Sequence, residues 1–60
     1  MSYTITELMN GTWQVVVSCA ASANGIDWLW ELMWRVSADE LGETIKVGYQ
    51  ACQGLAQGVL

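Results

Sequence analysis

The sequence has no histidine and very few basic residues. Only two of its 60 residues are Lys or Arg, namely Arg35 and Lys46. Without histidine the usual general base is missing, and neither a Cys–His pair nor a Ser–His–Asp triad can form. Two cations also leave little to neutralise phosphates, so direct binding to nucleic acid or to an anionic membrane surface is disfavoured. The composition therefore predicts a protein that is not an enzyme and does not bind nucleic acid directly.

Ligands for a metal or a cofactor are equally scarce. Cys19 and Cys52 are the only cysteines, and without histidine they cannot complete a four-ligand zinc site unless carboxylates are added. A haem-like group would need an axial ligand that the chain lacks. Asp27 and Glu31 would lie one helical turn apart, but no second pair completes a two-metal motif. We therefore expect no metal and no cofactor.

We also expect neither a membrane span nor a secretory signal in this sequence. Residues 8–26 carry no charge, but Asn10, Gln14 and Ser18 make this stretch too polar for a convincing membrane span. No Lys or Arg precedes the apolar residues around Cys19, which argues against a secretory signal. The sequence thus predicts a cytoplasmic protein whose two cysteines are buried, reduced thiols.

The length of the chain limits how stable it can be alone. Residues 1–60 can form one small domain, which buries only about 60% of its unfolded surface. Charged residues make up 13% of the chain, and the net charge is −4. Because this surface is poor in charge, we expect the chain to associate with a protein partner or with itself, most simply as a dimer.

Residues 3–19 fit two structures. Asn10-Gly11 is the strongest two-residue hairpin signal, and it lies between Thr-rich and Val-rich segments. Simple pairing across that turn, however, places Tyr3 and Ile5 on the same face as Glu7. Helical periodicity separates apolar from polar residues better, with a start at Thr4 and a stop at Asn24-Gly25. We therefore predict a helix over 5–23, with an N-terminal β-hairpin as the alternative.

Residues 26–36 are rich in tryptophan. Their charged residues, Asp27, Glu31 and Arg35, recur at the i, i+4 spacing of one helix face, and apolar side chains fill the rest. A second helix with so much apolar surface predicts contact with another chain. In that helix Trp34 would be an exposed interface anchor and Leu29 a core residue. The predicted interface is Trp28, Leu29, Trp30, Met33 and Trp34.

A third helix is predicted over 38–58. Ser37 and Glu40 form a capping-box pattern at its start, and an apolar stripe runs through Leu41, Gly48 and Cys52. The acidic residues Asp39, Glu40 and Glu43 form either a docking patch or, the favoured interpretation, ordinary first-turn carboxylates. A further stripe of small residues could form a second interface: Val47, Ala51, Gly54 and Gly58.

These patterns together predict an all-α domain, a compact bundle of three short helices; the alternative is an N-terminal hairpin followed by two helices. The expected function is that of a small acidic interaction protein, such as an assembly subunit, an adaptor or a surface-blocking inhibitor of the viral (phage) type, binding through the Trp-rich helix. The alternative function is a membrane-active or membrane-associated helical peptide.

Overall fold

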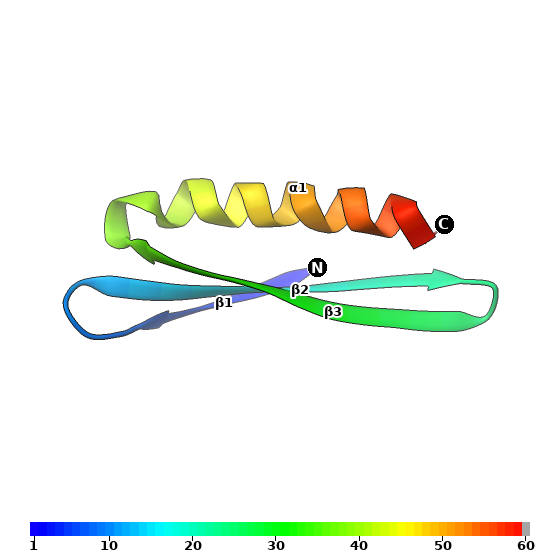
Figure 1. The fold of residues 1–60 in the computed structure, drawn as a ribbon, viewed down its shortest axis with the longest axis horizontal. Coiled ribbons are helices and arrows are strands. Elements are labelled where there is room, and N and C mark those ends of the chain that lie inside the picture. Colours follow the sequence, from blue (N-terminus) through cyan, green and yellow to red (C-terminus); the bar gives the residue numbers. More distant parts are fainter. Residues whose placement is uncertain (60) are drawn as a thin grey trace.

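The chain folds as a three-stranded antiparallel sheet with one helix running along one face of it, roughly in line with the strands (Figure 1). The computed structural model describes residues 1–59, with overall dimensions of 44 × 16 × 12 Å. Its elements, in chain order, are β1 (Ser2–Glu7), β2 (Thr12–Ala23), β3 (Ile26–Ser37), the 3-10 turn η1 (Ala38–Glu40) and α1 (Leu41–Val59). The strand order is β1-β2-β3, so β2 lies in the centre of the sheet.

The prediction of an all-α bundle of three helices is wrong. The predicted helix over 5–23 is the hairpin of β1 and β2, and the predicted helix over 26–36 is β3. The alternative fold is correct for the first hairpin but wrong for 26–36. Only the third predicted helix is present, as η1 followed by α1.

The loop between β1 and β2 sets a register that gathers more apolar side chains on one face than pairing across a two-residue loop would. Asn10 and Gly11 have positive φ values of 60° and 72°. The N–H of Leu8 donates to the Thr12 carbonyl at 2.8 Å, so the loop has three residues instead of two. Glu7 therefore pairs with Trp13, and this register places Ile5 opposite Val15. Tyr3 and Ile5 thus join the valines on the face beneath α1.

The second turn makes β3 the next strand of the sheet. Asn24 and Gly25 have φ values of 55° and 76°, and the residues on either side, Ala23 and Ile26, pair with each other. Two left-handed residues in a two-residue loop are typical of a type I′ turn, which suits the twist of a hairpin. Beyond this turn, apolar residues occupy every second position of β3, as expected for a strand with one buried face.

The hydrophobic core lies between β2 and α1. Val15 and Val17 are fully buried, while Cys19 and Cys52 are 3% and 1% exposed. Helix α1 lies mainly over the central strand and packs less extensively on β3. Burial therefore declines towards β3, where the residues facing α1 are only half-buried: Trp30, Leu32, Trp34 and Val36.

A disulfide joins the central strand to the helix. Cys19 on β2 is bonded to Cys52 on α1, and their Cα atoms are 5.7 Å apart. The expectation that both cysteines are buried is correct, but the expectation that they are reduced thiols is wrong. Strand periodicity places Cys19 on the core-facing side of β2, and helical periodicity places Cys52 on the core-facing side of α1. Because both sides meet in the same core, the two sulfur atoms come together.

Gly48 allows α1 to approach the sheet closely. This residue is buried, and a Cβ atom added to it would lie 2.6 Å from Cγ2 of Val17 and 3.2 Å from Cζ3 of Trp34. A Cβ atom at Gly54, further along the same helix, would have no atom within 4 Å. The two glycines thus occupy opposite environments on one helix.

Substituting these glycines is expected to have opposite effects. Gly48→Ala should lower the free energy of unfolding by about 1–2 kcal/mol, because overpacking costs ~1–3 kcal/mol and the better helix propensity of Ala returns only part of it. Gly54→Ala should raise the same free energy by up to about 1 kcal/mol. Urea denaturation of both variants measures the difference. Equal shifts in one direction would contradict the close packing at Gly48.

Candidate interaction surface

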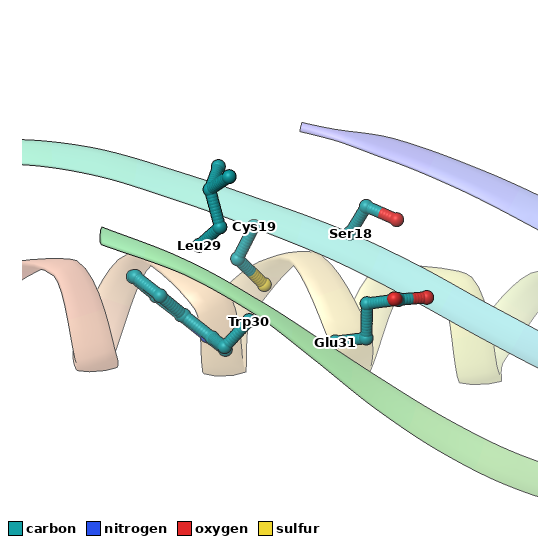
Figure 2. Close-up of a pocket in the computed structure, with 5 residues that line it drawn as sticks. All are labelled: Ser18, Cys19, Leu29, Trp30 and Glu31. Carbon is teal, nitrogen blue, oxygen red and sulfur yellow. The ribbon is translucent and has the colours of Figure 1, made fainter. Parts of the chain in front are cut away.

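The five residues of the predicted interface lie on both faces of β3. Trp28, Trp30 and Trp34 pair with Ala21, Cys19 and Val15 and share their face beneath α1, whereas Leu29 and Met33 point to the opposite, open face of the sheet. Figure 2 shows this division at one point of the strand, where Leu29 and the sulfur of Cys19 point to opposite sides. A strand therefore separates side chains that a helix would have gathered.

The exposure of these side chains reverses one sequence-based expectation. Leu29, expected in the core, is 80% exposed, while Trp34, expected as the exposed anchor, is half-buried and packs against the core. Trp28 and Met33 remain 44% and 58% exposed. The helical assignment of 26–36 caused the error, because it placed Leu29 in the middle of the apolar arc.

The backbone of β3 forms a further part of the surface. The hydrogen bond from Leu8 to Thr12 directs the N–H groups of even-numbered β2 residues towards β1, so the odd-numbered ones face β3. Their β3 partners are even-numbered, as in the pair Val15 and Trp34. The N–H and C=O groups of odd-numbered β3 residues consequently point away from the sheet: Asp27, Leu29, Glu31, Met33, Arg35 and Ser37.

This outer edge of β3 has little of the usual protection against pairing. Within residues 1–59 no strand pairs with it, and α1 lies over β2 instead. Natural edge strands are commonly short, or carry Pro, charged side chains (Lys above all) or a bulge. Strand β3 has 12 residues without Pro, Gly or Lys, and it pairs with β2 in an unbroken register; its charged residues are Asp27, Glu31 and Arg35. The opposite edge strand, β1, has only 6 residues and is rich in Ser and Thr.

The remaining predicted sites lie on η1 and α1. The small-residue stripe is only partly covered: Val47 is 42% exposed, Ala51 is half-buried, and Gly54 and Gly58 have open space around them. Its role as a second interface stays a prediction.

The acidic residues lie where the helical segment begins. The Ser37 hydroxyl is 2.6 Å from Oδ1 of Asp39 and 2.7 Å from Oε1 of Glu40, and it can donate to one of them at a time. It makes no capping bond to a backbone N–H, so the predicted capping box has the right place but different bonds. Glu43 lies in the first turn of α1, where the helix dipole stabilises a carboxylate.

Two small cavities lie beside β3. One of about 280 Å³ is lined by the residues of Figure 2: Ser18, Cys19, Leu29, Trp30 and Glu31. The other, of about 150 Å³, is lined by Trp34, Glu40, Glu43, Thr44 and Val47. The hydroxyl of Thr44 donates to the Glu40 carbonyl at 2.8 Å. In the described part of the chain, no group of three Cys, Asp or Glu side chains is placed to hold a metal ion.

Comparisons with known proteins found no similar protein. No family model, curated protein sequence or solved structure matches this chain. Among residues 1–59, no helix has both the length and the apolar character needed to cross a membrane. The outer edge of β3 is the surface that the sequence-based prediction missed. The signal that could have revealed it was the apolar residue at every even position from Ile26 to Val36, although Leu29 and Met33 interrupt a strict alternation.

Proposed function

We propose that this chain is a small, non-enzymatic interaction protein that binds another protein by adding a strand to the outer edge of β3. The observation that supports the proposal is the long, unpaired and apolar edge itself. Extended segments bind such edges through main-chain hydrogen bonds, and side-chain pockets add specificity. The role expected from the sequence, binding through tryptophan-rich residues 26–36, is kept, but a strand replaces the helix.

The side chains around this edge suit protein binding on both faces. On the face beneath α1, the half-buried Trp30 and Trp34 still offer part of their rings to a neighbouring strand. On the open face, Leu29 and Met33 are exposed beside the charged Glu31. Aromatic and Met side chains are enriched in protein interfaces, where Trp often dominates the binding energy. The alternative membrane role relied on a Trp-rich helix, and that segment is β3.

The disulfide bears on where the protein would work. The cytoplasmic location expected from the sequence assumed reduced thiols. Disulfides such as Cys19–Cys52 form and persist mainly in oxidising compartments. We therefore include an oxidising compartment in the proposal, in place of the cytoplasm.

A proline at position 33 tests the edge directly. The N–H of Met33 points away from β2, so Met33→Pro removes an outward donor without removing a hydrogen bond between β2 and β3, and edge strands tolerate such a proline. Met33→Ala is the matched control, because it removes the same side chain and keeps the N–H. We expect native mass spectrometry and pull-down assays to show a complex that Met33→Ala retains and Met33→Pro weakens at least about tenfold.

Circular dichroism must first show that both variants keep the fold. Equal binding by Met33→Pro and Met33→Ala would contradict the proposal, and so would the absence of any complex. Flotation with neutral liposomes covers the membrane alternative. Co-flotation of the wild type and both variants, without a protein complex, would favour a membrane role instead.

A further inference from the structure

We propose that the strand added to β3 is the β3 strand of a second copy of this chain, antiparallel and centred on Met33. The inference rests on the proposed function, because it requires that the edge of β3 accepts a strand. It adds the identity of the occupant and the register of the pairing. The resulting dimer would have one continuous six-stranded sheet, with both helices on the same face.

Symmetry restricts the registers that are available. A two-fold axis perpendicular to the sheet makes the two β3 strands antiparallel and keeps both copies of α1 on one side. In each such register one residue of β3 lies on the axis and faces its own counterpart in the other copy. A residue a given number of positions after it then faces the residue the same number of positions before it in the other copy. Odd-numbered residues then face odd-numbered residues, so the charged side chains of β3 meet one another on the open face.

The charges of β3 favour one of these registers. With Met33 on the axis, Glu31 of each copy lies opposite Arg35 of the other, which gives two opposite-charge pairs. With residue 31 on the axis, Asp27 would meet Arg35, but the two Glu31 carboxylates would face each other. Axes at 29 and at 35 place only like charges opposite each other. Axes at the even-numbered residues from 30 to 34 pair no charges at all.

The Met33 register also suits the apolar residues. On the face beneath α1, Trp34 of one copy lies opposite Leu32 of the other, and Trp30 lies opposite Val36. These four side chains are only half-buried in the single chain, because α1 covers β2 more than β3. Aromatic and aliphatic pairs across strands are stabilising. On the open face, the two Met33 side chains meet at the axis. Each of them is 58% exposed in the single chain, so their contact would bury apolar surface.

The other edge of the sheet lacks these features. Strand β1 has 6 residues, and its single charged residue is Glu7 at the end of the strand. No register of β1 against itself can therefore form an opposite-charge pair. Only β3 combines length, apolar side chains and charges of both signs.

Charge reversal at positions 31 and 35 provides the test. Both side chains are exposed and lie opposite the uncharged residues Ser18 and Gln14 of β2, so reversal should leave the single chain folded. Glu31→Lys places a lysine opposite Arg35, and Arg35→Glu places a glutamate opposite Glu31. We expect sedimentation analysis to show each single variant dimerising at least about tenfold more weakly than the wild type. The double variant restores both pairs and should dimerise within about threefold of the wild type.

Mixing the two single variants makes the test independent of any general loss of stability. In a mixed dimer, the lysine of the Glu31→Lys chain faces the glutamate of the Arg35→Glu chain, and the remaining native Arg35 faces the remaining native Glu31. We expect native mass spectrometry of an equimolar mixture to show the mixed dimer in excess over both homodimers. Asp27→Lys is the matched control, since it reverses a charge on the same face but outside the paired residues 29–37, and it should not weaken the dimer.

Several results would overturn the inference. These are a wild type that stays monomeric at millimolar concentration, single variants that dimerise normally, a double variant that is not restored, and loss of dimer in Asp27→Lys, which would indicate the axis at residue 31. A monomeric wild type that still binds another protein in a manner abolished by Met33→Pro would overturn this inference and leave the proposed function standing. A monomer that binds nothing through Met33 would overturn both.

Discussion

Reduction of the Cys19–Cys52 disulfide is expected to lower the free energy of unfolding by about 3–4 kcal/mol. The bond joins residues separated by 33 positions, and such a cross-link removes conformational freedom from the unfolded chain. It also ties the sheet directly to the middle of α1. Thermal or urea denaturation with and without dithiothreitol measures the effect.

The double variant Cys19→Ala/Cys52→Ala is the control for this experiment. It lacks the bond in either buffer and leaves no buried thiol, so dithiothreitol should not change its stability. Its free energy of unfolding should resemble that of the reduced wild type, apart from the small loss of packing by the two sulfur atoms. A wild type whose denaturation is the same in both buffers would contradict the prediction.

The small core explains why the single disulfide contributes a large share of the free energy of unfolding. Small domains gain roughly 0.05–0.15 kcal/mol of stability per residue, which for a chain of this length is about 3–9 kcal/mol in total. Among residues 1–58, the buried hydrophobic residues of the core are Val15, Val17 and the two cysteines themselves. Loss of the disulfide would therefore consume much of the stability, and the reduced chain should be partly unfolded. Dimerisation through β3 would offset part of the loss, because it stabilises only the folded state.

The sequence could predict the helical end of the molecule because its signals were unambiguous there. Ser37 precedes a segment with clear helical periodicity, and the expected stripe through Leu41, Gly48 and Cys52 does face the core in the structure. The start at residue 38 is also correct, although the first turn is a 3-10 turn.

Residues 26–36 could not be assigned from their charges, because those charges fit both periods. Asp27, Glu31 and Arg35 recur every four residues, and a spacing of four keeps side chains on one face of a helix and also on one face of a strand. The apolar residues resolve the ambiguity, since they occupy every even position from Ile26 to Val36. The second Asn-Gly pair is then a hairpin turn, and not the end of a helix.

The first hairpin is only the alternative prediction from the sequence because of a difference of one residue in the length of its loop. A two-residue loop at Asn10-Gly11 would place Leu8 opposite Trp13 and leave Tyr3 and Ile5 with polar neighbours. The three-residue loop shifts β1 by one position, and this shift exchanges its two faces completely. Tyr3 then packs edge to face against Tyr49 of α1, with ring centroids 6.1 Å apart. The length of the loop depends on how the strands pack against the rest of the fold, and the turn residues alone do not specify it.

Alanine substitutions at Trp34 and Leu29 distinguish the strand from the helix that the sequence suggested. Both side chains belong to β3, but Trp34 packs against the core beneath α1, whereas Leu29 is 80% exposed on the open face. We expect Trp34→Ala to lower the free energy of unfolding by about 3 kcal/mol, the lower end of the usual cost for this change, because the indole is only half-buried. Leu29→Ala should change it by no more than about 0.5 kcal/mol.

The comparison is sharpest in dilute solution, where association contributes least to the measured stability. A helix over 26–36 predicts the reverse order, with the larger loss at Leu29 and an intact fold after Trp34→Ala. Urea denaturation followed by far-ultraviolet circular dichroism measures both variants in the same way. A Leu29→Ala variant that loses as much stability as Trp34→Ala would contradict the assignment of the two residues to opposite faces of β3, and with it the exposed edge from which the dimer is inferred.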